Sequence, residues 1–169
     1  ARNILELGTL GGYSTIWLAR AAGEAGRVIT LEIDPHHARV ARTNLESAGV
    51  AGRVELRVGP AADSLRALIA EGAGPFDLIF LDADKPSNPE YLQLALQLSR
   101  PGSVIIGDNV VRSGGILDPD SEDPSIQGTR RFHELIAADP RLDATVVQTV
   151  GSKGYDGFAL ALVRAAPSP

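Results

Sequence analysis

Short apolar runs alternate with longer stretches of helical periodicity along this chain, and this alternation constrains its fold more than any other feature. The first five apolar runs are expected to be strands: Ile4–Leu7, Val28–Ile33, Val54–Val58, Phe76–Leu81 and Ser103–Gly107. The segments between them are expected to be helices: Ser14–Ala22, Pro35–Ala48, Ala62–Ala70 and Asn88–Arg100. Helices between consecutive strands are the usual crossovers of a parallel sheet. The alternation therefore predicts an α/β domain with a doubly wound, Rossmann-like sheet.

The C-terminal third departs from this pattern. A loop over Val110–Gln127 and a helix over Gly128–Ala138 precede two apolar runs, Thr145–Val150 and Gly157–Val163. Six residues separate these runs, too few for a parallel crossover, so an antiparallel hairpin is expected. The predicted sheet is thus parallel with an antiparallel C-terminal hairpin, and 169 residues fit one domain over 1–169.

Composition excludes several kinds of chemistry. The chain has no cysteine, which excludes disulfides, thiolate metal sites and cysteine nucleophiles. Its net charge is −5 and it has no basic run to neutralise phosphates, so we expect no nucleic-acid partner. It has no apolar stretch of about 18 residues and no signal-peptide pattern, so we expect a cytoplasmic protein without a membrane partner. The sequence starts without methionine and directly in a strand, so an N-terminal segment is expected to be missing.

A glycine cluster follows the first expected strand, where open α/β sheets bind ligands. Gly8, Gly11 and Gly12 would let the backbone approach a nucleotide-like ligand, and Ser14 is expected to cap the helix that follows. Glu32 ends the second strand, where a carboxylate can accept both ribose hydroxyls. The alternative is a tight strand–helix turn beside a capping or solvated glutamate.

The loop differs from those that bind dinucleotides. The G-x-G-x-x-G fingerprint is absent because position 10 is leucine, and the chain has no phosphate-binding G-K-[ST] motif. The loop instead reads E-x-G-x-x-G, beginning at Glu6. A carboxylate there repels pyrophosphate and favours a positively charged ligand. S-adenosylmethionine (SAM), with its sulfonium and ammonium groups, fits this requirement.

Oxygen-bearing side chains follow the fourth and fifth expected strands. Asp82 closes the fourth strand, and Asp108 and Asn109 close the fifth. If these strands are neighbours, about 4.8 Å apart, the three side chains meet at one edge of the sheet. Mg²⁺, Ca²⁺ or Mn²⁺ would suit such oxygen ligands. The alternative is two ordinary solvated acids at strand ends.

Lys85 is unusual because the chain has only two lysines, Lys85 and Lys153, beside 14 arginines. Lysine can release its proton in a protein where burial or a nearby cation lowers its pKa, whereas arginine cannot. A lysine three residues after a candidate metal ligand is therefore a candidate general base. The alternative is a surface lysine at the start of a helix.

Other side chains carry weaker indications. Trp17 and Phe132 are interpreted as core residues on helix faces. Asp63 and Ser64 could contact adenine or cap a helix. The acidic segment 118–123 contains a proline and lacks the glycine of a calcium loop, so it is interpreted as solvated.

Three segments together resemble the cation-dependent O-methyltransferases that use SAM, the group of catechol O-methyltransferase and caffeoyl-CoA O-methyltransferase. The segments are L-E-L-G-T-L-G-G-Y-S from Leu5, E-I-D from Glu32, and F-D-L-I-F-L-D-A-D-K from Phe76. The resemblance continues through G-D-N from Gly107 to the helix ending at Ala138, so it covers nearly the whole chain.

The resemblance implies roles for individual residues. Gly8, Tyr13 and Ser14 would line the methionine end of SAM, Glu32 would hold the ribose, and Ala61 would lie near the adenine. Metal ligation would fall to Asp82, Asp108 and Asn109, and proton removal to Lys85. The resemblance also implies a small catechol-like aromatic acceptor, helices before the first strand, and a homodimer.

These features predict a divalent-cation-dependent SAM O-methyltransferase. One alternative is a SAM methyltransferase that needs no metal. Another is a catalytically silent SAM-binding module, which would bind the cofactor without transferring its methyl group. An RNA methyltransferase is disfavoured by the net charge of −5.

Overall fold

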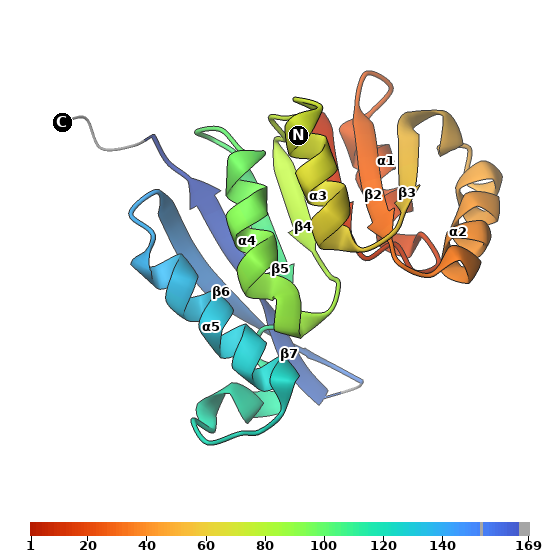
Figure 1. Cartoon of the computed structure of the whole chain (residues 1–169). Helices are drawn as coiled ribbons and strands as arrows, with labels where there is room; N and C mark the ends of the chain where they lie inside the picture. The colour runs from red at the N-terminus through yellow and green to blue at the C-terminus, as the bar shows by residue number, and fades with distance from the viewer. Residues whose placement is uncertain (153, 166–169) are drawn as a thin grey trace.

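The computed structural model describes residues 1–152 and 154–165 and contains a seven-stranded sheet in the order β3-β2-β1-β4-β5-β7-β6 (Figure 1). The strands are β1 (Asn3–Leu7), β2 (Arg27–Glu32), β3 (Val54–Val58), β4 (Leu78–Leu81), β5 (Val104–Asp108), β6 (Leu142–Gly151) and β7 (Gly154–Val163). The first five strands pair in parallel, whereas β7 runs antiparallel to both β5 and β6. The predicted parallel sheet with an antiparallel C-terminal hairpin is confirmed. Lys153 lies outside the described residues.

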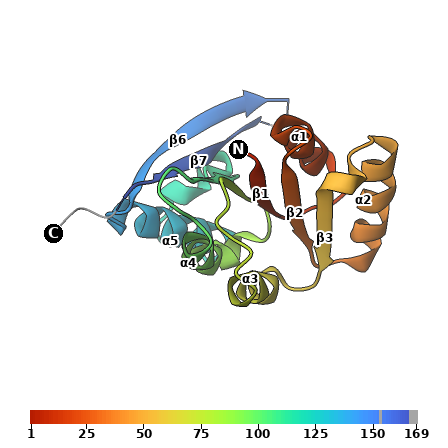
Figure 2. The same ribbon diagram turned by 90° about the horizontal axis from the view of Figure 1, so that it is seen from above.

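Helices cover both faces of the sheet (Figure 2). They are α1 (Tyr13–Ala22), α2 (Pro35–Ser47), α3 (Ala61–Ala70), α4 (Asn88–Gln97) and α5 (Pro124–Ala138). Helices α1 and α2 pack around Ile4, Val28 and Leu45 on one face. Helices α3, α4 and α5 pack on the opposite face, around a larger apolar cluster. This doubly wound arrangement follows from the crossover helices between parallel strands.

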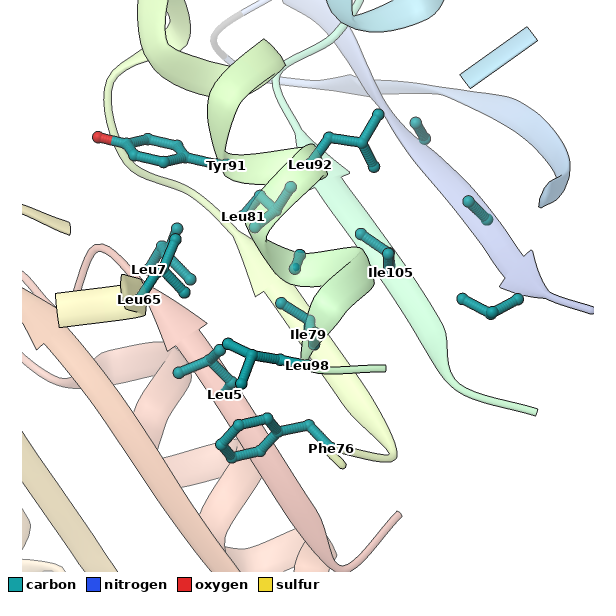
Figure 3. Close-up of a cluster of buried hydrophobic side chains, with 14 of the residues drawn as sticks. Leu5, Leu7, Leu65, Phe76, Ile79, Leu81, Tyr91, Leu92, Leu98 and Ile105 are labelled. Carbon is teal, nitrogen blue, oxygen red and sulfur yellow. The ribbon is translucent and has the colours of Figure 1, made fainter. Parts of the chain in front are cut away.

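The larger cluster fixes the central strands relative to one another. Figure 3 shows side chains of this cluster from β1, β4, β5, α3 and α4, from the segment before β4 and from the C-terminal end of α4: Leu5, Leu7, Leu65, Phe76, Ile79, Leu81, Tyr91, Leu92, Leu98 and Ile105. All ten are buried, as expected for strands that are covered by helices. Close packing of this kind leaves little freedom for the strands to slide. The ends of β1, β4 and β5 are therefore held in a fixed relation.

Three local expectations are wrong. The N-cap of α1 is Gly12, in the left-handed conformation, so Ser14 lies within the helix and does not cap it. Helix α5 begins at Pro124, before the expected Gly128, because Asp123 caps it by accepting a 2.7 Å hydrogen bond from the Ser125 N–H. The expected loop over 110–127 also contains a kinked 3₁₀ segment, η3 (Arg112–Leu117).

The two aromatic side chains interpreted as core residues differ in outcome. Phe132 on α5 is fully buried, as expected. Trp17 on α1 is 55% exposed and stacks against the guanidinium group of Arg20, so its interpretation as core is wrong. Helical spacing alone does not distinguish a core face from an exposed aromatic face.

Among the described residues, no helix combines the length and apolarity that crossing a membrane requires.

Candidate active site

The parallel register brings the candidate residues to one edge of the sheet. Leu7 at the end of β1 pairs with Leu31 of β2 and with Leu81 of β4, and Leu81 pairs in turn with Gly107 of β5. The residues that follow these positions in the chain are Gly8, Glu32, Asp82 and Asp108. Residues scattered over a hundred positions of the sequence therefore form one row at the carboxyl ends of the strands, where open α/β sheets bind ligands.

Gly8 allows the loop after β1 to approach the loop after β4. Its φ of 97° lies in the region that favours glycine, and a Cβ atom there would be 2.3 Å from the carbonyl oxygen of Asp82. No side chain fits in this gap. The absence of a side chain at Gly8 therefore lets the candidate cofactor loop pack directly against the backbone of Asp82, the first candidate metal ligand.

Glu32 is buried and organises the opposite side of the same loop. Its carboxylate accepts hydrogen bonds from the N–H groups of Leu10, at 2.7 Å, and Asp34, at 2.9 Å. His37 Nδ1 lies 3.5 Å from a carboxylate oxygen of Glu32. Beside Glu32 is a hollow of about 260 Å³ whose other walls are mainly apolar. Its lining residues are Gly8, Leu31, Glu32, Ile33, Ala61, Ala83, Asp84 and Tyr91.

Glu6 lies beneath the loop and is fully buried. Its carboxylate accepts hydrogen bonds from the hydroxyls of Thr15 and Thr30, the latter at 2.7 Å, and Thr30 lies 2.6 Å from the Thr9 hydroxyl. Burial raises the pKa of the Glu6 carboxyl, while hydrogen bonds from Ser14, Thr15 and Thr30 oppose this shift. One carboxylate oxygen, Oε1, has no hydrogen-bond partner among residues 1–152 and 154–165. The network thus ties β1, β2 and α1 to the loop.

The remaining predicted cofactor residues lie around this loop. Tyr13 begins α1 with 78% of its surface exposed, and the half-buried Ser14 follows it. Ala61 begins α3 and lines the hollow beside Glu32. Asp63 neither caps α3, whose N-cap is Pro60, nor lines the hollow. Its carboxylate instead pairs with Arg66 at 3.1 Å, on the exposed surface.

Asp82, Asp108 and Asn109 are all partly buried at adjacent strand ends. Burial raises the pKa of the Asp82 carboxyl; Lys85 opposes the shift, and the negative charge of Asp108 adds to it. The Asp108 carboxylate accepts a 2.7 Å hydrogen bond from the Asn109 N–H. Asn109 has a φ of 54°, unusual for a residue with a side chain. The described residues contain no metal-binding group of three or more histidines, cysteines or acids, and this set has two carboxylates and one amide.

Lys85 is only 7% exposed, so the alternative of a surface lysine is wrong. It begins the short 3₁₀ helix η2 (Lys85–Ser87), and its Nζ lies 3.1 Å from Asp82 Oδ1. Helix α5 packs closely on this turn at Gly128, where a Cβ atom would be 2.4 Å from the Lys85 carbonyl oxygen. The structure thus brings the buried amino group of Lys85 to the candidate metal ligands.

Two residues near the site have no clear signal in the sequence. Tyr91 on α4 lines the hollow, and its hydroxyl donates a 2.6 Å hydrogen bond to Asp84. Asp156 on β7 contacts the loop that follows Asn109, 47 positions earlier in the chain. The DAD sequence before Lys85 could have drawn attention to Asp84. Nothing local identifies Asp156, because the pairing of β7 with β5 brings it to the site.

The sheet order, the glycine loop after β1 and the acidic residue ending β2 together define a SAM-dependent methyltransferase. The chain belongs to the O-methyltransferase family, whose family model matches residues 1–163.

Relatives support this assignment. The chain is 57% identical over 164 residues to a catechol O-methyltransferase of Niastella koreensis, a match that covers 97% of this chain and 74% of the relative. It is 59% identical over 164 residues to a catechol O-methyltransferase of Mycobacterium tuberculosis, covering 97% of this chain and 73% of that protein.

Solved structures agree in fold and cofactor. An O-methyltransferase from Bacillus cereus in complex with SAH superposes with a TM-score of 0.95 at 62% identity, covering 97% of this chain and 74% of that one. An O-methyltransferase from Streptomyces achromogenes involved in tomaymycin synthesis, in complex with SAM, has a TM-score of 0.94 at 54% identity, covering 98% and 74%. The prediction of an O-methyltransferase that uses SAM is confirmed.

Proposed function

We propose that this protein transfers a methyl group from SAM to a hydroxyl of a small catechol-like aromatic, and that the transfer requires a divalent cation. The observation that carries the proposal is the meeting of Asp82, Asp108 and Asn109 at adjacent strand ends, with the buried Nζ of Lys85 3.1 Å from Asp82. The naming of two relatives as catechol O-methyltransferases supports the choice of acceptor.

The residues around the glycine loop fit SAM. Glu32 has spare lone pairs on both oxygens after accepting its two backbone hydrogen bonds, and these would accept the ribose hydroxyls. Ala61 would lie against the adenine in the mainly apolar hollow. Gly8, Tyr13 and Ser14 would line the methionine end. Glu6 would support SAM binding indirectly: its carboxylate is fully buried and holds the glycine loop in place through the Thr15 and Thr30 hydroxyls.

The donor set at the ends of β4 and β5 fits a hard cation such as Mg²⁺, Ca²⁺ or Mn²⁺. Two carboxylates and an amide supply oxygen ligands, and the repulsion between Asp82 and Asp108 would be relieved by a positive charge between them. When bound, a divalent ion would hold both oxygens of a catechol and favour its ionised form. The three side chains would fix the ion at the edge of the sheet, beside the glycine loop.

Lys85 would act as the general base for the reacting hydroxyl. Its Nζ is held beside Asp82 by burial and by the close packing of α5, so in its neutral amine form it would accept the proton of the reacting hydroxyl and become an ammonium group without leaving its position. The loop held by Gly8 would align the methyl donor with the acceptor oxygen, because it is joined to the Asp82 backbone. Alignment of two reactants is itself a large source of rate enhancement.

Isomeric acceptors test this proposal. Catechol and resorcinol carry the same two hydroxyls, but only catechol can chelate a metal through adjacent oxygens. We expect transfer of labelled methyl to catechol with Mg²⁺, loss of transfer with excess EDTA, and little transfer to resorcinol. Equal transfer with and without EDTA would favour the metal-independent alternative. SAM binding without transfer to any acceptor would favour the silent module.

The role of Lys85 needs a separate test. Lys85→Ala is expected to abolish transfer to catechol while SAM affinity stays close to that of the wild type. Lys85→Arg keeps the charge but cannot release a proton, so it is also expected to be inactive. Turnover retained in the alanine variant would contradict the assignment of Lys85 as the base.

A further inference from the structure

The backbone after Asn109 is held in an unfavourable conformation. Positive φ angles occur at Asn109 (54°), Arg112 (55°), Ser113 (52°) and Gly114 (85°). Three of these residues carry side chains, for which this region of the backbone map is unfavourable. Such a segment persists only where its surroundings impose the conformation. The contacts of this segment therefore bear on the position of Asn109.

Five hydrogen bonds join this segment to the start of β7, and a sixth lies within the start of β7 itself. Asp156 Oδ1 accepts from the N–H groups of Val111 at 3.0 Å, Arg112 at 2.9 Å and Gly157 at 2.9 Å. The Val110 N–H donates to the Gly157 carbonyl at 3.0 Å. The neighbouring Tyr155 and Ser113 exchange two more hydrogen bonds, in which the hydroxyl of each donates to the backbone carbonyl of the other, at 2.7 and 3.2 Å.

The close approach of the hairpin depends on Gly157. A Cβ atom at this position would be 2.5 Å from the Val147 carbonyl oxygen and 2.7 Å from Val111 Cγ2. The hairpin and the segment after Asn109 also border a cavity of about 370 Å³, whose lining includes Asn109, Thr149 and Asp156. Asp156 and Gly157, which bind the backbone of residues 110–112, thus lie beside Asn109, the third candidate metal ligand.

We propose that Asp156 is a positioning residue for the cation site, acting through the backbone of residues 110–112 on the Asn109 side chain. The inference rests on the proposed function, since it assigns Asn109 to the cation. Without the Asp156 carboxylate, the N–H groups of Val111 and Arg112 lose their acceptor, and Asn109 is free to relax from its positive φ. A change of φ moves the Asn109 side chain relative to the ends of β4 and β5, and the cation loses one of its three proposed protein ligands.

Calorimetry of Mg²⁺ binding to the SAM-loaded protein tests this inference. In Asp156→Ala we expect Mg²⁺ affinity to fall about 10- to 100-fold, the usual effect of removing a residue that orients a metal ligand. SAM affinity is expected to stay within about twofold, because Glu32 and Gly8 lie at the ends of other strands. Asp156→Asn keeps an oxygen that can accept the same N–H groups and is expected to recover most of the Mg²⁺ affinity.

The control is Asp143→Ala, which removes an exposed aspartate from β6 of the same hairpin and is expected to leave both affinities unchanged. Hydrogen exchange of residues 109–114 gives a second measurement, with faster exchange expected in Asp156→Ala only. If Asp156→Ala does not fold, Asp156→Gln, which misplaces the acceptor by one methylene, is measured instead with the same expectation.

The outcomes separate the two claims. Wild-type Mg²⁺ affinity in Asp156→Ala, with only the melting temperature lowered, would overturn the positioning role and leave the proposed function standing. Absence of Mg²⁺ binding in the wild type would overturn the cation-dependent function and the positioning role together. Reduced Mg²⁺ affinity with unchanged SAM affinity, restored by asparagine, would support the positioning role.

Discussion

Replacing Gly8 by alanine tests whether the ends of β1 and β4 are joined as closely as the structure shows. The added Cβ would be 2.3 Å from the Asp82 carbonyl oxygen and 2.8 Å from its carbonyl carbon, both backbone atoms that cannot rotate away. The φ of 97° adds about 1–2 kcal/mol for a residue with a side chain. Overpacking against fixed neighbours adds about 1–3 kcal/mol. The free energy of unfolding is thus expected to fall by about 2–5 kcal/mol.

Thermal and urea denaturation would measure this loss. For a chain of this size, each kcal/mol lowers the melting temperature by about 2–4 °C, so Gly8→Ala should melt roughly 4–20 °C below the wild type. Gly49→Ala is the matched control: its φ of 69° is also positive, but no atom lies within 4 Å of the added Cβ. Gly49→Ala therefore reports the backbone cost alone.

The difference in stability loss between Gly8→Ala and Gly49→Ala measures the cost of the close approach to Asp82. Gly8→Ala is expected to lose about 1–3 kcal/mol more than Gly49→Ala, and also to lose SAM affinity, because the two loops must separate. Equal losses in the two variants would refute the close approach of the glycine loop to Asp82. Unchanged SAM affinity in a clearly destabilised Gly8→Ala would refute the role of that approach in shaping the cofactor site.

Three further predictions follow from the structure. Glu32→Ala should weaken SAM binding in calorimetry by about 1.5–3 kcal/mol, the scale of hydrogen bonds to a charged group, and full affinity would exclude Glu32 from the ribose site. The Asp77 pKa is lowered to about 2 by hydrogen bonds from the Asn3 and Arg2 N–H groups and by Arg100, so its carboxylate stabilises the fold above pH 4 and loses this effect as the pH falls toward 2. Asp77→Asn should therefore lower the free energy of unfolding by about 1–2 kcal/mol at pH 7, after allowance for partial exposure of the carboxylate. Urea titrations should show this difference from the wild type shrinking below pH 4, and a difference independent of pH would contradict the prediction. Phe132→Ala should cost about 3–5 kcal/mol, whereas Trp17→Ala should cost less than about 1 kcal/mol, and equal costs would argue that Trp17 is buried after all.

Most of the sheet could be predicted from the sequence because its evidence is local. A continuous apolar strand such as the one predicted over Phe76–Leu81, or the short connection before Gly157, carries its own signal of parallel or antiparallel pairing. The convergence of Asp82 and Asp108 also follows from sequence, once β4 and β5 are taken as neighbours. Such inferences need only the period of the pattern and the geometry of parallel sheets.

What the sequence did not reveal depends on tertiary contacts. Trp17 has the helical spacing of a core residue, yet no element among the described residues buries it. Ser14 is a common capping residue, but the left-handed Gly12 already ends the loop two positions earlier. Asp156 reaches the loop after Asn109 only through the pairing of β7 with β5. In each case the deciding partner is distant in sequence or is a backbone conformation.

The most direct measurement of the proposed cation site is a crystal structure with SAH and Mn²⁺, in which anomalous scattering locates the metal. We predict one strong peak between Asp82, Asp108 and Asn109, at about 2.0–2.3 Å from an oxygen of each, as expected for a hard divalent ion. No peak at these strand ends at millimolar Mn²⁺, or a peak only among the acidic residues 118–123, would contradict the cation-dependent mechanism.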